Sequence, residues 1–334
     1  MVDPNAPPVF VSGDAARAVF RWSDAIEALQ QAYAHQADPV ALPARTVARG
    51  GGAWLRTLPA LPPGTRYFGA KLMGLSATAP APGAEYVIVL FDRETSRIAA
   101  FVDANVVTAY RTAATTAAAL DRIAPAKVAR LAVLGSGLEA AMHVRAIASV
   151  RDLSEIAIFS PTPARREAFA ASMQEELGVT ATACASPEEA VRDSGLVLAA
   201  ARSQGERPIL YGDWLRDGAV VASIGSTVPE QREIDISVIE RSDLIVCDMV
   251  EEVLEETGDM IAAHEAGIEF HGKSFGLFDL MSGSLDSQVR AARNPMFKSV
   301  GGGLQDVVVA GLILTKVLEA GLATPLPIAF ETKR

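Results

Sequence analysis

A short glycine-containing string near the middle of the chain has the pattern of a phosphate-binding turn. The apolar run Arg130–Leu134 leads directly into Gly135-Ser136-Gly137-Leu138-Glu139-Ala140, which opens a helical segment. In such a GxGxxA string the first glycine permits a tight turn, and the second lets the backbone approach a pyrophosphate. Free N–H groups at the helix start then hold the anion. Glycine-rich turns also occur for steric reasons alone, but this strand–turn–helix context predicts a dinucleotide site that includes the following residues: Gly135, Ser136, Gly137, Leu138 and Glu139.

The end of the next predicted strand, Glu155–Phe159, bears on which dinucleotide is bound. NAD-selective sites usually carry Asp or Glu there, on the ribose 2′-hydroxyl. This chain has Ser160 and Thr162 instead, followed by Arg165 and Arg166. Hydroxyl and guanidinium groups suit a 2′-phosphate, so NADP(H) is favoured, with Ser160, Thr162 and Arg165 as contacts. NAD(H) stays possible if the two arginines are only solvated residues in the first turn of a helix.

Four cations elsewhere are candidates for binding an anionic substrate. Arg45, Arg56 and Lys71 fall on three neighbouring β-like runs, and Arg111 lies early in a long helix. Arg56 and Lys71 sit among apolar residues, so each either lies on a solvated strand face or holds an anion. If several of them converge, they form a carboxylate site, because guanidinium forks bind carboxylates bidentately.

The other reactive residue types form no recognisable pattern. The four histidines have no metal-ligand spacing, and His264-Glu265 lacks the second histidine of an HExxH motif. Cys184 and Cys247 form neither a disulfide framework nor a metal-type spacing. GxSxG and P-loop motifs are absent from the sequence as well. We therefore expect no metal site and no serine or cysteine nucleophile.

Two different kinds of structure must position these residues. Over the first hundred residues, a helix at Trp22–His35 precedes strands that follow one another without intervening helices, which favours an antiparallel or mixed sheet. These predicted strands are Ala44–Arg49, Ala53–Leu58, Arg66–Leu72, Tyr86–Phe91 and Ile98–Val102. Ser76–Ala84 is rich in Pro and Ala and is expected to be a loop.

From a long helix at Asn105–Arg122 onward, strands and helices alternate. That alternation predicts βαβ units and a doubly wound parallel sheet. The predicted strands are Arg130–Leu134, Glu155–Phe159, Val179–Ala183, Leu196–Ala200, Ala219–Ile224 and Leu244–Cys247. The predicted helices between the first of them are Leu138–Val150, Pro163–Glu176 and Pro187–Asp193. The tail Leu304–Ala320 is apolar on most faces and is expected to be a buried helix.

Charge and composition exclude several classes of partner. The chain has 334 residues, with 30 Lys+Arg against 40 Asp+Glu and a net charge of −10. A protein with a net negative charge is not attracted electrostatically to nucleic acid or to an anionic membrane surface. No uncharged apolar run reaches the ~18 residues of a membrane-spanning helix, and the start lacks the features of a signal peptide. We expect a soluble cytoplasmic protein.

A series of short motifs follows in a fixed order along the chain. They are Pro43-Ala44-Arg45, Leu58-Pro59-Ala60, Gly69-Ala70-Lys71, Leu90-Phe91-Asp92, Thr108-Ala109-Tyr110-Arg111-Thr112-Ala113-Ala114, Leu134-Gly135-Ser136-Gly137, Ile224-Gly225-Ser226 with Pro229 and Arg232-Glu233, and Phe297-Lys298-Ser299-Val300-Gly301 with Asp306. In this order they resemble the ornithine cyclodeaminase/mu-crystallin family over essentially the whole chain.

The resemblance implies a fold and a set of roles. A Rossmann-type doubly wound parallel sheet (residues 121–303) is inserted in an α+β domain (residues 1–120 and 304–334) that binds substrate and forms a homodimer. Arg45, Lys71 and Arg111 match the positions that hold the substrate α-carboxylate. The residues expected near the cofactor are Ile224 and Lys298, together with Arg111 and Thr112.

Two departures from the cyclodeaminase pattern bear on the reaction. Cyclodeaminases carry an aspartate in the loop after Gly225, where it handles the proton of the substrate amine; the matching residue here is Thr227, which is no general base at neutral pH. A glutamate of the cyclodeaminases is replaced here by Arg56. The substrate is therefore expected to lack a basic amine beside Arg56, and a second carboxylate on it becomes an option.

These features predict an NAD(P)H-dependent reductase of a carboxylate-bearing imine, which yields an L-amino acid. Pyrroline-2-carboxylate and iminosuccinate are candidate substrates, bound by Arg45, Arg56, Lys71, Arg111 and Thr227. Lys71 and Arg111 are expected to be catalytic, and Asp306 is a candidate proton donor, with helix capping as its alternative role. Two other functions stay open: a cyclodeaminase that releases ammonia, and a non-catalytic protein that binds NADPH and a small ligand.

Overall fold

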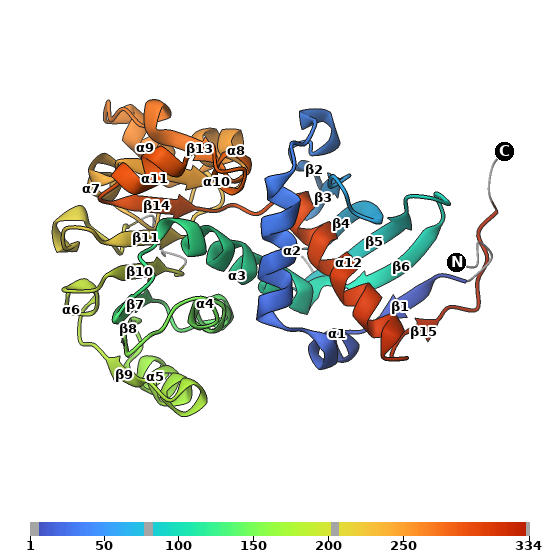
Figure 1. The fold of residues 1–334 in the computed structure, drawn as a ribbon, viewed down its shortest axis with the longest axis horizontal. Helices are drawn as coiled ribbons and strands as arrows, with labels where there is room; N and C mark the ends of the chain where they lie inside the picture. The colour runs from blue at the N-terminus through green and yellow to red at the C-terminus, as the bar shows by residue number, and fades with distance from the viewer. Residues whose placement is uncertain (1–6, 77–82, 202–206, 332–334) are drawn as a thin grey trace. The chain divides into compact units, whose positions relative to one another are not determined.

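The computed structural model of the chain describes residues 7–76, 83–201 and 207–331. The chain divides into two compact units, Met1–Thr112 with Gly302–Arg334, and Ala113–Gly301. Each unit is built on its own β-sheet (Figure 1). The second unit interrupts the first in sequence and holds a parallel sheet, so the expected α/β fold class is confirmed.

The first unit contains, among its described residues, a seven-stranded sheet in the order β15-β1-β6-β5-β4-β3-β2. Its strands are β1 (Val9–Val11), β2 (Thr46–Gly50), β3 (Ala53–Ala60), β4 (Tyr67–Ser76), β5 (Ala84–Asp92), β6 (Ile98–Asp103) and β15 (Thr324–Pro325). Neighbours from β2 to β6 pair antiparallel, whereas β1 pairs parallel with β6. The mixed sheet agrees with the prediction. Of the expected loop Ser76–Ala84, both ends are strand residues, and residues 77–82 lie outside the described residues.

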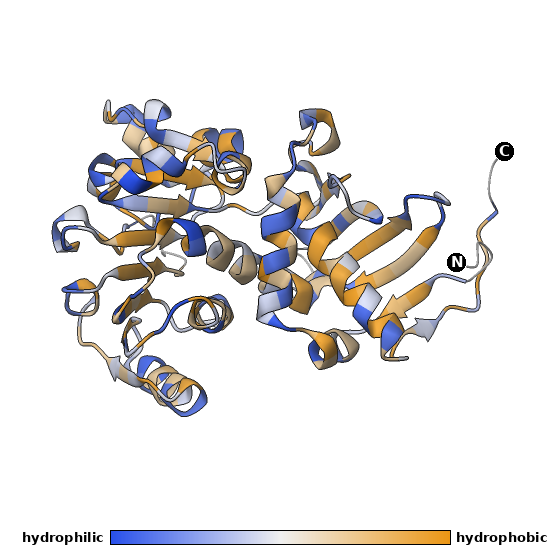
Figure 2. Cartoon of the chain, viewed as in Figure 1, coloured by the Kyte–Doolittle hydropathy of each residue, from blue (hydrophilic) through white to orange (hydrophobic). Residues whose placement is uncertain are grey.

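One long helix packs on this sheet. The helices of this unit are α1 (Gly13–Val19), α2 (Trp22–Ala34), η1 (Pro39–Ala41) and α12 (Gly303–Glu319), with the start of α3 (Ala104–Ile123). Figure 2 shows hydrophobic residues along α12 and along β4 and β5. A Cβ on Gly311 of α12 would lie 3.1 Å from the ring of Tyr67 on β4, so helix and strand approach closely there. The chain's last long helix therefore completes the core of the first unit.

The second unit contains, in its described part, eight parallel strands in the order β13-β12-β14-β11-β10-β7-β8-β9. They are β7 (Arg130–Leu134), β8 (Glu155–Phe159), β9 (Thr180–Ala183), β10 (Leu196–Ala199), β11 (Val220–Ser223), β12 (Leu244–Cys247), β13 (Ser274–Gly276) and β14 (Pro295–Lys298). The helices are α4 (Leu138–Ala148), α5 (Pro163–Leu177), α6 (Pro187–Val191), η2 (Gly212–Trp214), α7 (Ile236–Arg241), α8 (Val250–Glu256), α9 (Gly258–Glu265), η3 (His271–Lys273), α10 (Leu277–Met281) and α11 (Asp286–Ala291). The strand order reverses between the neighbouring strands β7 and β10, so the switch point of this doubly wound sheet lies between them.

Strand β14 is the main element that the sequence analysis did not predict. It lies between β12 and β11, and all four of its residues are buried. A strand buried on both faces shows no alternation of polar and apolar residues, and four residues are too few to suggest an element. Pro295 stands at its first position, where a proline is tolerated. The local pattern therefore hides the strand that carries Lys298.

Two glycines on β4 provide a test of the packing. A Cβ on Gly69 would lie 2.0 Å from the Val89 carbonyl oxygen on β5, whereas nothing lies within 4 Å of a Cβ on Gly74. We expect Gly69→Ala to lower the free energy of unfolding by about 2 kcal/mol or more, because the backbone of a paired strand cannot yield without loss of register. Gly74→Ala should change it by less than about 0.5 kcal/mol. Urea denaturation of both variants measures the difference, and equal losses would contradict this packing.

Candidate functional site

Strand register brings two of the predicted substrate-binding cations, Arg56 and Lys71, to one face of the mixed sheet. Arg56 on β3 is opposite Met73 on β4, and Leu58 is opposite Lys71. Residues two apart on a strand share a face, so Arg56 and Lys71 do so as well. Val47 on β2 is opposite Arg56, and Arg45 lies two residues before Val47. Arg56 and Lys71 thus share a face on neighbouring strands, and Arg45 directly precedes β2, the next strand of the sheet.

A buried carboxylate from α12 pairs with Lys71. Nζ of Lys71 donates to Oδ1 of Asp306 at 2.9 Å and lies 2.9 Å from Oδ2. Nε of Arg111, on α3, lies 2.9 Å from Oδ1 of the same carboxylate. Lys71 is 3% exposed, Arg111 6% and Asp306 0%. Two of the predicted cations therefore share one fully buried acid.

Gln305 extends the network to a fourth element. Its side-chain oxygen accepts from Nη1 of Arg111 at 2.8 Å, and its Nε2 donates to the hydroxyl of Tyr33, on α2, at 3.1 Å. The guanidinium of Arg111 is thereby oriented by both Gln305 and Asp306. The first turn of α12 carries both partners, so it sets the geometry of the network.

Glycine explains how the start of α12 reaches this position. A Cβ on Gly303 would lie 2.6 Å from the Pro59 carbonyl oxygen of β3, so only glycine lets the helix begin against that strand. The N-cap of α12 is Gly302, and Asp306 is the fourth helical residue. Its carboxylate is committed to Lys71 and Arg111 rather than to the helix terminus. The geometry does not support the capping role considered from the sequence.

The network carries more positive than negative charge. Two cations face one carboxylate, and Arg56 lies on the same sheet face, with its guanidinium 5.1 Å from the centre of the Trp54 ring. Burial lowers the pKa of Lys71 to about 8, and the charges of Arg111 and Arg56 act in the same direction, while Asp306 opposes them. Several cations close to one another favour an anionic ligand, because ammonium and guanidinium groups form charge-assisted hydrogen bonds with it.

The second unit contains a cavity at the predicted dinucleotide turn. It measures about 760 Å³ and is lined by the following described residues: Leu134–Glu139, Phe159–Thr162, Arg165, Ala200, Ala201 and Arg207–Ile209. Gly135 has a φ of +136°, and a Cβ there would lie 2.6 Å from the Ala200 carbonyl oxygen. The N-cap of α4 is Gly137, which has no side chain to cap the helix's first N–H groups. This cradle fits a pyrophosphate.

The residues at the end of β8 take different positions around the cavity. Ser160 and Thr162 line it, and the hydroxyls of Ser136 and Ser160 are 2.9 Å apart. Arg165 also lines the cavity. Arg166 instead donates to the Ser160 carbonyl oxygen at 3.0 Å, with its guanidinium 5.7 Å from the centre of the Phe159 ring.

Arg207 lines the cavity beside Arg165, and the sequence analysis did not single it out. Arg207 lies outside every motif described above, so its place at the cavity could not be predicted from the sequence.

The other residues expected at the cofactor are not among the described residues that line this cavity. Lys298 is fully buried at the end of β14, with Nζ 2.9 Å from Oδ2 of Asp259 and 3.1 Å from the Ser223 hydroxyl. Ile224 directly follows β11 and is 7% exposed. Thr227, which was expected at the substrate rather than at the cofactor, donates its backbone N–H to the side chain of Gln231 at 3.2 Å. The Thr112 hydroxyl donates to the Thr108 carbonyl oxygen within α3.

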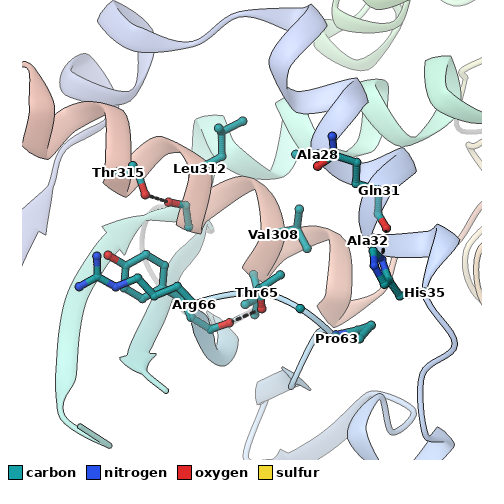
Figure 3. A pocket seen from close by; sticks show the side chains of 14 residues that line it. Ala28, Gln31, Ala32, His35, Pro63, Thr65, Arg66, Val308, Leu312 and Thr315 are labelled. Carbon is teal, nitrogen blue, oxygen red and sulfur yellow. Dashed lines mark hydrogen bonds between the residues drawn. The ribbon is translucent and has the colours of Figure 1, made fainter. Parts of the chain in front are cut away.

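A further cavity of about 300 Å³ in the first unit lies among α2, α12 and the segment that includes Thr65 and Arg66 (Figure 3). Arg66 donates to Asp92 at 2.9 Å, so its charge is compensated. His35 contacts the carbonyl oxygen of Gln31 at 2.7 Å. This cavity lacks the buried positive excess of the Lys71 network, and we assign no anion-binding role to it.

The described part of the chain has neither a membrane-spanning helix nor a cluster of metal-ligating side chains. In residues 7–76, 83–201 and 207–331, no helix is long and apolar enough to cross a membrane. Over the same residues, His, Cys, Asp and Glu form no group of three or more that could hold a metal ion.

The ordered motifs of the sequence agree with the family that matches this chain. The model of the ornithine cyclodeaminase/mu-crystallin family matches residues 15–321. The chain belongs to this family. It is an NAD(P)-dependent oxidoreductase.

Individual relatives cover most of the chain. It is 30% identical over 240 residues to the ketimine reductase mu-crystallin of Mus musculus, which is 72% of each chain. It is 26% identical over 241 residues to a Delta(1)-pyrroline-2-carboxylate reductase of Bacillus cereus, covering 72% of this chain and 73% of the relative. The solved structure of a probable ornithine cyclodeaminase from Bordetella pertussis Tohama I superposes with a TM-score of 0.82 at 28% identity, covering 94% of this chain and 98% of that one.

The shared carboxylate of the Lys71 network can be tested by its removal. We expect Asp306→Asn to lower the free energy of unfolding by about 3 kcal/mol, because it leaves Lys71 and Arg111 buried without their acid. Asp24→Asn is the control, since Asp24 of α2 also pairs with a residue of α12, Lys316, at 2.6 Å, but both side chains are about one-third exposed. It should cost less than about 1 kcal/mol. Urea denaturation at pH 7 compares the two, and a loss for Asp306→Asn no larger than for Asp24→Asn would contradict the assignment.

Proposed function

We propose that this protein is an NAD(P)H-dependent reductase of an imine that carries a carboxylate beside its C=N carbon, and that the product is an L-amino acid. The observation that carries the proposal is the buried network in which Lys71 and Arg111 share the one carboxylate of Asp306. An ammonium and a guanidinium group held together in this way suit a substrate carboxylate, which both groups bind through charge-assisted hydrogen bonds. Relatives named as a ketimine reductase and a pyrroline-2-carboxylate reductase support the same class of reaction.

Two substrates are candidates within that class. Pyrroline-2-carboxylate needs one carboxylate contact, whereas iminosuccinate needs two. Arg56 lies on the same sheet face as Lys71 and is the residue we assign to a second carboxylate. Arg45 directly precedes β2, the strand beside β3.

The loop after β11 argues against ammonia-releasing cyclisation. That reaction needs a group that accepts a proton from the substrate amine, and the residue at the matching position is Thr227, whose hydroxyl does not act as a base at neutral pH. Glu230, the nearest acid along this loop, is exposed.

The proposed roles follow from the geometry of the first unit. Arg45, Lys71 and Arg111 bind the substrate carboxylate and orient the adjacent C=N bond. Reduction also needs a proton for the nitrogen. We assign this proton to the ammonium of Lys71, which pairs with Asp306 at 2.9 Å. NAD(P)H, when bound, supplies the hydride.

The cofactor and assembly complete the proposal. Gly135, Ser136, Gly137, Leu138 and Glu139 form the pyrophosphate turn, and Arg165 contacts a 2′-phosphate, so NADP(H) is favoured over NAD(H). From the family resemblance we also propose that Ile224 and Lys298, in the second half of the parallel sheet, lie near the bound cofactor. We also propose, from the family resemblance, that the unit with the mixed sheet binds substrate and forms a homodimer.

The proposed reaction is tested by reduction of pyrroline-2-carboxylate and iminosuccinate with each cofactor. We expect turnover whose kcat/KM falls about tenfold per pH unit above pH ~8, because the free enzyme then loses the Lys71 ammonium, whose pKa is about 8. Lys71→Arg should be slower but should lack this fall, since a guanidinium stays charged. Ionisation of the substrate affects both proteins equally, so the difference between the two profiles isolates Lys71.

Two results would contradict the proposal. One is the absence of imine reduction with either cofactor by a protein that binds NADPH, which would favour a non-catalytic binding protein. The other is robust release of ammonia from ornithine without added cofactor, which would favour a cyclodeaminase.

The choice of cofactor is tested at two adjacent arginines. We expect Arg165→Ala to weaken NADPH binding by roughly 10- to 100-fold, the range for a lost charge-assisted hydrogen bond, and NADH binding by less than about threefold. Arg166→Ala is the matched control, because Arg166 is committed to the Ser160 carbonyl oxygen and the Phe159 ring. It should leave the NADPH/NADH ratio unchanged. Fluorescence titration measures both affinities, and an equal loss of both cofactors in Arg165→Ala would remove Arg165 from the 2′-phosphate.

A further inference from the structure

One buried carboxylate ties together two loops at the carboxyl ends of β10 and β11. Glu233 is fully buried. Its Oε1 accepts from the backbone N–H of Ala201, in the loop after β10, at 2.8 Å. Its Oε2 accepts from the backbone N–H of Gly225, in the loop after β11, and from the Ser223 hydroxyl, both at 2.9 Å. The two loops are therefore held by a side chain that belongs to neither of them.

Ala200, directly after β10, packs on the phosphate-binding turn, and Gly225, after β11, packs on Ala201. A Cβ on Gly225 would lie 2.2 Å from Oε1 of Glu233 and 2.6 Å from the Ala201 carbonyl oxygen. A Cβ on Gly135 would lie 2.6 Å from the carbonyl oxygen of Ala200. The turn after β7 and the loops after β10 and β11 thus lie against one another without space for a side chain between them.

Other charged groups face Glu233 from two elements. Lys298 of β14 shares the Ser223 hydroxyl with it, at 3.1 Å. Asp259 of α9 accepts from the backbone N–H of Glu233 at 2.7 Å and pairs with Lys298 at 2.9 Å. Burial and Asp259 raise the pKa of Glu233, while Lys298 lowers it, and the result is about 7. The carboxylate is thus costly to bury, and its hydrogen bonds to the two loops offset that cost.

A doubly wound sheet binds a dinucleotide across its switch point, one mononucleotide on each half. The turn after β7 and the end of β8 belong to the first half, which takes the adenosine and the pyrophosphate. Strands β10, β11 and β14 belong to the second half. By this division the nicotinamide mononucleotide lies over the loops that Glu233 holds.

We propose that Glu233 is a positioning residue for the nicotinamide half of the dinucleotide. It acts through the loops after β10 and β11 and does not touch the ligand. The inference rests on the proposed dinucleotide binding, but it is independent of the substrate.

Glu233→Gln is the test variant. A glutamine offers a single oxygen acceptor, so its NH₂ group must face the N–H of either Ala201 or Gly225, and one loop loses its anchor. We expect the Kd of NADPH to rise about tenfold or more, while the Kd of 2′,5′-ADP, which lacks the nicotinamide half, changes less than twofold. Isothermal titration of the full-length protein without substrate measures both. If the wild type prefers NADH, NADH and ADP are the probes.

Asp243→Asn is the matched control. Asp243 accepts from the backbone N–H groups of Arg293 and Asn294 at 2.7 and 3.0 Å, and so pins a loop at the opposite, amino-terminal edge of the same sheet. It should change neither affinity. Wild-type affinities retained in Glu233→Gln, or an equal loss of dinucleotide and fragment, would each overturn the inference, because the second pattern marks a general structural role.

The wild-type protein provides the test if Glu233→Gln does not fold. Protonation converts one oxygen of Glu233 into a donor, so the ratio of the dinucleotide Kd to the fragment Kd should rise at least threefold from pH 8 to pH 6. A constant ratio would overturn the inference. A wild type that binds neither NADH nor NADPH would refute the proposed cofactor instead, and binding without imine reduction would refute only the proposed reaction.

Discussion

The ion pairs of Asp306 with Lys71 and Arg111 are the constraint on which the first unit depends. Two cations are buried on β4 and α3, and neither is tolerated there without a compensating acid. That acid comes from α12, 235 residues after Lys71 in the sequence. Because α12 follows the parallel sheet in the sequence, the chain returns to the first unit after it has built the second, and the ion pairs and the apolar faces of α12 hold this last helix in the first unit.

In the second unit the buried groups that need compensation are carboxylates rather than cations. Glu233 and Asp259 face the single ammonium of Lys298, so negative charge is in excess. Backbone N–H groups at the strand ends donate hydrogen bonds to Glu233. These hydrogen bonds hold the loops in place. In the first unit the excess is positive and lies at the start of a helix on a sheet face. The sign and the surroundings of each cluster separate a substrate-binding role from a positioning role.

Local patterns in the sequence predicted the elements that depend on near neighbours. Strand β7, strand β8 and the start of α4 were predicted to the residue, because a buried strand, a glycine turn and a helix follow one another within the chain. The pairing of Lys71 with Asp306 could not be predicted from spacing, since it joins distant segments. The different positions of Arg165 and Arg166 were also hidden, because adjacent residues of one helical turn point in different directions.

The net charge of this protein is negative, whereas the side chains around Lys71 include several cations. At −10 overall, its long-range field repels an anionic substrate. Salt screens that field within about 10 Å, whereas contacts inside a buried network are screened far less. In the proposed function, an anionic substrate is therefore selected by contacts with Lys71, Arg111, Arg45 and Arg56 rather than by long-range steering. Burial is what allows a small cluster of cations to act against the sign of the whole surface.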